Sequence, residues 1–208
     1  MNLPKDYQSK MQEMLGEEYL QYLDSFHYSY GQTLRVNQLK MEPADFIRRF
    51  LLSGQVSWCN TGFYYEGDQK LSAHPYYYAV VYYLQEPSAM APAAFLPVEP
   101  GDRVLDLCAA PGGKSTALAA KLQGEGILIS NDISASRCKP LLKNMEMAGV
   151  SNAVITCESP EKLADRFFGY FDKVLVDAPC SGEGMFRREP SMVKSWSLEE
   201  VNRYAELQ

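Results

Sequence analysis

A glycine-rich turn between a short apolar strand and an Ala/Leu-rich helix is the feature that most constrains this chain. Val104 and Leu105 precede the turn, residues 106–116 read Asp-Leu-Cys-Ala-Ala-Pro-Gly-Gly-Lys-Ser-Thr, and the helical pattern continues to Leu122. Proteins of the α/β class build nucleotide-shaped sites in this way, because glycine lets the backbone approach a ligand and the first N–H groups of the helix point at it. We therefore expect an α/β sheet with a ligand at this turn.

The spacing of the glycines narrows the choice of ligand. A Walker phosphate loop needs a glycine five residues before Gly113, and that position holds Cys108. A dinucleotide fingerprint needs G-x-G-x-x-G, whereas Gly112 and Gly113 are adjacent. Asp132, after the next apolar run, lies about where an acidic side chain meets ribose hydroxyls in a doubly wound fold. A ribose without a pyrophosphate loop favours S-adenosyl-L-methionine over NAD; the alternative is a turn that is merely tight.

Composition limits the class of protein. The chain has 208 residues, 46% of them hydrophobic, and no apolar run approaches the length of a membrane span, so we expect a cytoplasmic protein with no membrane partner. Five scattered cysteines without a C-x-x-C pair, and only two histidines, argue against disulfides and against a metal site. The net charge of −6 does not by itself point to a nucleic-acid partner.

The N-terminal part shows mixed patterns. Residues 4–30 have apolar positions at helical spacing, residues 34–37 resemble a short strand, and residues 43–51 form a second helical pattern that opens on proline. Residues 56–84 are rich in tyrosine. Such tyrosines can stack on bases, but more often they are core and rim residues, which is the interpretation we favour.

Four prolines between residues 85 and 100 mark a junction between two units. We expect a small α+β domain over residues 1–90, with contacts to RNA. The second domain, residues 91–208, is expected to be a Rossmann-like sheet.

After Gly101 the pattern alternates regularly between strands and helices. We expect strands over 103–107, 127–130, 154–157 and 173–176, and helices over 115–122, 135–147 and 161–167. Such an alternation implies a parallel sheet with right-handed crossovers, which binds ligands outside the carboxyl ends of its strands. Those ends carry the segment 106–114, Asp132, Glu158 and Asp177.

The fourth strand is followed by Asp-Ala-Pro-Cys-Ser-Gly, residues 177–182. An exposed thiol with a lowered pKa can act as a nucleophile. Methylation of a pyrimidine at C5 needs both a thiol and a methyl donor, because C5 is a weak nucleophile until a thiolate adds at C6. Asp177 is placed to stabilise that addition. By itself Cys180 would usually be a small buried hydrophobe, but this loop favours the chemical interpretation.

These motifs resemble the Sun family of RNA 5-methylcytosine methyltransferases, with the bacterial ribosomal-RNA branch the closest. The resemblance rests on residues 83–90, 104–115, 131–132 and 177–185, and residues 33–37 resemble the N-terminal domain of the family. It implies a Rossmann-like methyltransferase that uses S-adenosyl-L-methionine as cofactor and ribosomal RNA as partner. It says nothing of the oligomeric state.

The resemblance also implies roles for single residues. The cofactor's methionine and ribose would contact a loop made of Cys108, Ala109, Ala110, Pro111, Gly112, Gly113 and Lys114. Asp132 would take the ribose hydroxyls, with Arg137 nearby. Glu158, rather than Ser159, would lie on the adenine side, and Asp177 would reach both the cofactor and the cytosine. Cys180 would assist breakdown of the covalent intermediate.

The chain departs from the family at its end. The family's attacking cysteine lies in a Thr-Cys step some tens of residues after the Pro-Cys loop, and no such step follows Cys180 before Gln208. The sequence therefore resembles the N-terminal, cofactor-binding part of such an enzyme. Two alternatives stay open: a methyltransferase in which Cys180 itself attacks the base, and a non-catalytic RNA-binding fragment.

Overall fold

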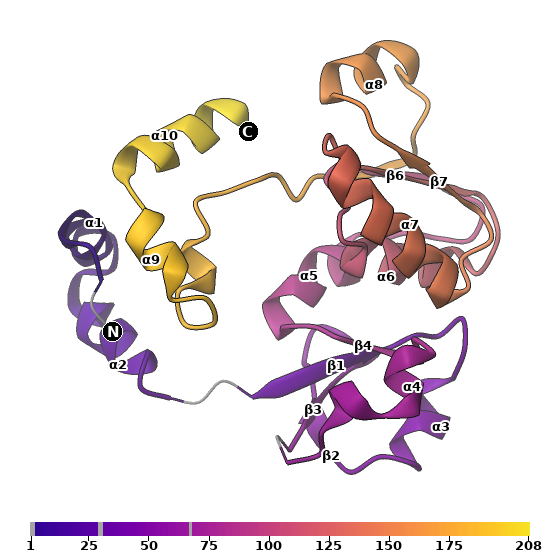
Figure 1. Cartoon of the computed structure of the whole chain (residues 1–208), viewed down its shortest axis with the longest axis horizontal. Helices are drawn as coiled ribbons and strands as arrows, with labels where there is room; N and C mark the ends of the chain where they lie inside the picture. Colours follow the sequence, from indigo (N-terminus) through magenta and orange to yellow (C-terminus); the bar gives the residue numbers. More distant parts are fainter. Residues whose placement is uncertain (1–2, 29–30, 67) are drawn as a thin grey trace. The chain divides into compact units, whose positions relative to one another are not determined.

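The computed structural model describes residues 3–28, 31–66 and 68–208, and the chain divides into two compact units (Figure 1). The larger unit is Gly31–Asp177, and the smaller one combines Met1–Tyr30 with Ala178–Gln208. Among the described residues, no helix is long and apolar enough to cross a membrane.

The smaller unit is helical. Its elements are α1 (Lys5–Leu15), η1 (Gly16–Glu18), α2 (Tyr19–Ser25), η3 (Glu183–Met185), α9 (Ser191–Ser195) and α10 (Leu198–Leu207). Its core holds Tyr7 with edge-on contacts to Phe186 and Trp196, whose ring centroids lie 5.0 and 5.2 Å away. The helix expected over 4–30 is interrupted, because Gly16 has a φ of +52° that ends α1. Residues 29 and 30 of that expectation lie outside the described residues.

The larger unit begins with a four-stranded antiparallel sheet in the order β2-β3-β1-β4 (Figure 1). Its elements are β1 (Gln32–Val36), α3 (Pro43–Ile47), β2 (Leu52–Gln55), β3 (Gly62–Tyr65), η2 (Leu71–Ala73), α4 (Pro75–Tyr78) and β4 (Tyr82–Leu84). Side chains alternate along β1: Leu34 and Val36 pack in a core with Phe46 of α3, whereas Arg35 faces the opposite side.

The tyrosine-rich segment supplies this core. Phe63, Tyr65 and Tyr82 are buried, which confirms the expectation of core residues for these positions. One other expectation was wrong in detail, because the second helix ends at Ile47 rather than Leu51. The proline-rich segment, for which no helix or strand was predicted, contains a helix, α5 (Pro87–Phe95). Proline is tolerated at the start of α5, because the first N–H groups of a helix have no partner within it.

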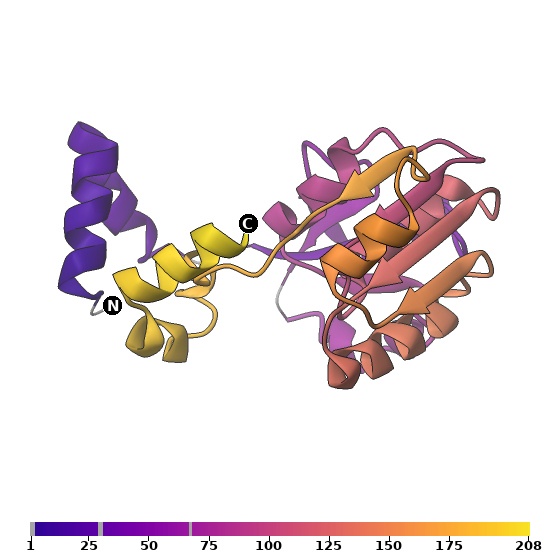
Figure 2. The ribbon, with the colours of Figure 1, turned by 90° about the horizontal axis from the view of Figure 1, so that it is seen from above.

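The rest of the larger unit is a parallel sheet in the order β7-β6-β5-β8 (Figure 2). Its elements are β5 (Arg103–Asp106), α6 (Gly113–Leu122), β6 (Ile127–Asn131), α7 (Ala135–Ala148), β7 (Ala153–Thr156), α8 (Pro160–Arg166) and β8 (Lys173–Leu175). These bounds confirm the expected strands and helices to within two residues. The fold is therefore the expected Rossmann-like α/β sheet.

The two faces of the parallel sheet are covered by different helices. Val104 packs in the core that includes Leu118 of α6 and Leu141 of α7, whereas Leu105 faces Leu163 of α8. Because all four strands run in the same direction, their carboxyl ends meet at one edge of the sheet. The loops that follow β5, β6, β7 and β8 therefore lie near one another.

Candidate functional site

The turn after β5 is tied to both neighbouring strands. The N–H of Leu107 donates to the carbonyl of Leu175 over 2.9 Å, and the N–H of Ala109 donates to the carbonyl of Asn131 over 2.7 Å. The turn thus leaves the sheet between β8 and β6, at the point where a ligand can reach three strand ends.

Gly112 lets this turn enter α6. Its φ is +110°, a conformation that side chains disfavour, and a Cβ built on it would lie 3.2 Å from Cδ1 of Leu141. The first three N–H groups of α6, those of Gly113, Lys114 and Ser115, precede the first hydrogen bond of the helix, from Thr116 to Gly112, and carry the positive end of its dipole. The backbone at this turn is therefore open to an electron-rich ligand group.

Asp106 ends β5 and is fully buried. Its Oδ2 accepts a hydrogen bond from Oγ of Ser115 over 2.7 Å, and Ser130 donates in turn to Ser115 over 2.9 Å. Its Oδ1 has no hydrogen-bond partner among the described residues. Burial raises the pKa of Asp106 to about 6. A buried carboxyl oxygen without a donor is costly, so this atom is suited to a ligand that brings a donor or a cation.

Asp132 follows β6 and is 2% exposed. Its Oδ1 accepts from the N–H of Ser134 over 3.0 Å, and its Oδ2 lies 3.3 Å from Nη1 of Arg137. Arg137, on the first turn of α7, also donates from Nη2 to the carbonyl of Ala110 over 2.8 Å. Arg137 therefore links the acidic residue after β6 to the turn after β5.

Asp177 follows β8, and its Oδ2 lies 2.5 Å from Nζ of Lys114. The carboxylate is half exposed, whereas the lysine side chain is 19% exposed. This ion pair joins the fourth strand end to the start of α6. Together with Asp106 and Asp132 it gives the site three carboxyl groups and, with Arg137, two cations.

The Cys108 thiol is protonated, and the Glu158 carboxylate already has an ion-pair partner in this structure. Burial, reinforced by the charge of Asp132, raises the pKa of the Cys108 thiol, so it stays protonated at neutral pH. The side chain of Glu158 pairs with Lys162 over 2.9 Å, and this hydrogen bond lowers the pKa of the carboxyl. Glu158 thus faces along α8 in this structure, although its backbone lies beside Asn131.

The side chain of Asn131, for which the sequence motifs predict no role, holds the strand ends together. Its amide nitrogen donates to the carbonyls of Leu107 and Glu158, over 3.1 and 2.9 Å. Its Oδ1 accepts from Oγ1 of Thr156 and from the N–H of Glu158. The position directly before Asp132 was the available signal, since polar side chains at a strand end can reach both neighbouring loops.

The structure brings together most of the candidates from the sequence, namely the turn of residues 108–114, Asp132, Arg137 and Asp177. Cys180 is exposed and belongs to the smaller unit. Within the described residues, no group of three or more His, Cys, Asp or Glu side chains is arranged to hold a metal ion. The site therefore offers carboxylates, two cations and free backbone N–H groups, a set that suits a ligand with hydroxyls and a positive charge.

Two family profiles match the chain. Residues 93–208 match the profile of the 16S rRNA methyltransferases RsmB/F, and residues 3–87 match the N-terminal domain of the 16S rRNA methyltransferase RsmF. Ribosomal RNA small subunit methyltransferase F of Vibrio cholerae is 34% identical over 223 residues, covering 100% of this chain and 46% of that protein. The chain therefore spans about half the length of the curated relatives it matches.

Solved structures share the fold. A methyltransferase homologue from Pyrococcus horikoshii is 26% identical with a TM-score of 0.80, over 96% of this chain and 64% of that one. NSun6 from the same organism, determined with SFG, has a TM-score of 0.84 at 19% identity, over 99% of this chain and 77% of that one. At 19% identity, the likeness to NSun6 is one of fold alone.

Proposed function

Because the chain belongs to the RsmB/F family of 16S rRNA methyltransferases, we propose that it binds S-adenosyl-L-methionine at the strand ends of its parallel sheet. The single observation that carries this proposal is the buried Asp106 carboxyl, whose Oδ1 has no partner among the described residues. S-adenosyl-L-methionine brings a sulfonium, an ammonium and two ribose hydroxyls. This set complements the carboxyl groups and free N–H groups of the site.

Each part of the site has a task in this proposal. The Asp106 carboxyl accepts a hydrogen bond from the ammonium group of the cofactor's methionine part. The Asp132 carboxylate accepts hydrogen bonds from the ribose hydroxyls. Gly112 lacks the Cβ that would otherwise lie 3.2 Å from Cδ1 of Leu141, so the turn packs closely against α7. Arg137 holds Asp132 in place by its second contact to the turn.

The reaction that we propose for the whole protein is methylation of cytosine C5 in ribosomal RNA. The cofactor supplies an electrophilic methyl group. Asp177, held by Lys114, accepts a hydrogen bond from the 4-amino group of the cytosine ring during addition of a thiolate at C6. Cys180, three residues further along the chain, assists the release of the product. The Asp-Ala-Pro-Cys sequence supports these two roles, and the small domain at residues 1–90 is proposed to contact the RNA.

The cofactor proposal is tested by isothermal titration calorimetry with S-adenosylhomocysteine. Replacing Asp132 with Asn removes one charge-assisted acceptor, so we expect the affinity to fall at least about tenfold. Asp165→Asn is the matched control, because Asp165 is exposed on α8 and no hydrogen bond or ion pair of its side chain is found in the described part of the chain. Equal affinities for the two variants would refute the assignment of Asp132.

The role of the Cys180 thiol needs a separate experiment. In the presence of S-adenosyl-L-methionine, a 5-fluorocytosine-containing ribosomal RNA fragment traps a covalent adduct when a cysteine adds at C6, because after methyl transfer the fluorine cannot leave C5 as a proton does. If Cys180 only assists the release of the product, no adduct forms between this chain and the 5-fluorocytosine-containing RNA. An adduct that disappears in Cys180→Ala would instead assign the attack to Cys180 and contradict the helper role.

A further inference from the structure

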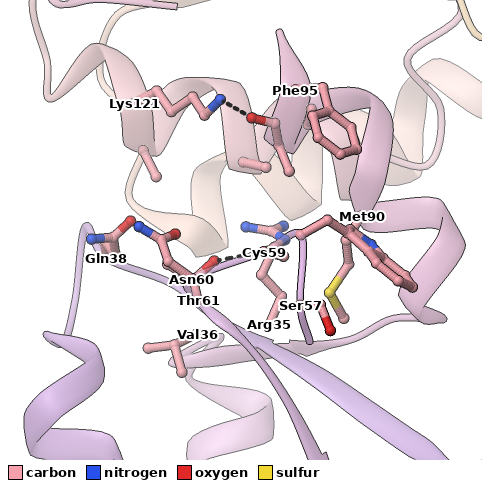
Figure 3. Close-up of a pocket in the computed structure, with 15 residues that line it drawn as sticks. Arg35, Val36, Gln38, Ser57, Cys59, Asn60, Thr61, Met90, Phe95 and Lys121 are labelled. Atoms are coloured by element: carbon pink, nitrogen blue, oxygen red, sulfur yellow. Dashed lines mark hydrogen bonds between the residues drawn. The ribbon is translucent and has the colours of Figure 1, made fainter. Parts of the chain in front are cut away.

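A cavity of ≈ 540 Å³ lies between the antiparallel sheet and helices α5 and α6 (Figure 3). All of its lining residues belong to the larger unit. In Figure 3 Arg35 comes from β1, Lys121 of α6 directs its ammonium at a backbone carbonyl of α5, and the amide side chains of Gln38 and Asn60 lie on one side. Its volume lies within the range of about 300–1,000 Å³ that is typical of small-molecule sites.

Arg35 is an unusual lining residue, because it is 3% exposed and has no ion-pair partner among the described residues. Its Nε donates to Oε1 of Gln85 over 3.0 Å, and its Nη2 donates to the carbonyl of Gly113 and to Oγ1 of Thr116, over 2.8 and 2.7 Å. Across the described chain, Nη1 makes no hydrogen bond to a protein group. Burial lowers the pKa of Arg35 to about 10, which reflects the cost of a buried cation without a counter-ion.

Lys121 adds a second positive charge. Its ammonium donates to the carbonyls of Ala94 and Leu96, over 2.8 and 2.7 Å, and so retains one N–H for a further acceptor. No aspartate or glutamate is among the residues that line the cavity in the described structure. The cavity is therefore electropositive in a chain whose net charge is −6. An anion would balance both cations.

An aromatic ring forms part of the wall. Trp58 is 39% exposed, and its indole is held by a hydrogen bond from Nε1 to the carbonyl of Pro87 over 2.9 Å. Phe95, at the end of α5, also lines the cavity and is exposed. Fixed, accessible aromatic rings beside cations are the combination by which proteins hold a base and its phosphate.

We propose that this cavity binds a pyrimidine or purine nucleotide, with its phosphate between Arg35 and Lys121 and its base against Trp58. The amides of Gln38 and Asn60 lie where they can contact the sugar or the base edge. The nucleotide can be free or can be one unit of a single-stranded RNA. This site is distinct from the proposed cofactor site, because none of its lining residues comes from the turn after β5.

The test is a calorimetric titration of the full chain with cytidine 5′-monophosphate, in the presence of saturating S-adenosylhomocysteine. We expect binding, and we expect cytidine without the phosphate to bind at least about tenfold more weakly. Lys121→Met should weaken binding by a similar factor, and Lys121→Arg should restore it. Lys139→Met is the matched control, since Lys139 is exposed on α7 and outside the cavity.

A short single-stranded cytidine oligomer distinguishes the two sources of the nucleotide. Tighter binding of the oligomer than of the monophosphate, with the same sensitivity to Lys121→Met and to Asn60→Ala, assigns the cavity to RNA, and equal binding assigns it to a free nucleotide. The proposal is overturned if neither compound binds, or if both substitutions leave binding unchanged. Because S-adenosylhomocysteine is titrated separately, failure of the cofactor proposal is seen independently, and the nucleotide titration is then run without it.

Discussion

Replacing Asp106 with Asn should change stability and ligand affinity in opposite directions. The carboxyl has a folded-state pKa of about 6 against an ordinary value of 3.8. Because the folded-state pKa is raised, the Asp106 side chain makes its full contribution to the stability of the folded form below pH 3.8. That contribution is lost as the pH rises through about 6. The difference of about two pKa units corresponds to about 3 kcal/mol. The free carboxylate thus destabilises the unliganded protein at pH 8.

Asp106→Asn removes that buried charge and keeps an oxygen that can accept from Ser115. We therefore expect the unliganded variant to be more stable than the parent by up to about 3 kcal/mol at pH 8, and to differ little near pH 4. The affinity for S-adenosylhomocysteine should fall at least about tenfold at pH 8. Opposite changes in stability and in ligand affinity are expected for a residue that serves a ligand rather than the fold.

Urea unfolding followed by tryptophan fluorescence measures the stability of the larger unit. The chain has two tryptophans, of which Trp58 lies in the larger unit and Trp196 in the smaller one, so Trp196→Phe makes Trp58 the reporter. A loss of stability of equal size at pH 4 and pH 8 would mean that Asp106 is a structural acceptor. That result would refute the reasoning.

Three further perturbations test separate parts of the structure. Gly112→Ala should destabilise the larger unit by more than Gly124→Ala, because both glycines have positive φ but only at Gly112 would a Cβ meet a neighbour, and urea unfolding measures both. Phe46→Ala removes a fully buried ring from the core of the antiparallel sheet and should cost about 3–5 kcal/mol in the same assay. Arg137→Met should raise the dissociation constant for S-adenosylhomocysteine by about tenfold in calorimetry, and an unchanged constant would contradict the link to Asp132.

The parallel sheet could be predicted closely from the sequence because its signals are local. Apolar runs of four or five residues alternate with helical patterns, and α7 ends at Gly149 in the left-handed conformation that glycine adopts readily. The right-handed crossover rule then brings the carboxyl ends of the strands to one edge. For this reason the sequence alone predicted that Asp132 and Asp177 follow strands whose ends lie at the same edge of the sheet, as they do in the structure.

The antiparallel sheet was harder to predict, because its strands are short and lack a clear period. The residues of β2 are Leu-Ser-Gly-Gln, mostly exposed, and they become a strand only by pairing with β3. Helix α5 was obscured by its prolines. The hydrogen bonds from Ser130 to Ser115 and from Asn131 to Leu107 were also missed, since they join residues that are 15 and 24 positions apart.

The central claim is that a methyl donor lies at the strand ends of the parallel sheet. Hydrogen exchange measured by mass spectrometry, with and without S-adenosylhomocysteine, tests it most directly. We predict slower exchange in residues 107–116 and 131–134, with β2 and β3 unchanged. Slower exchange confined to other segments, or no change at a saturating concentration, would contradict the account.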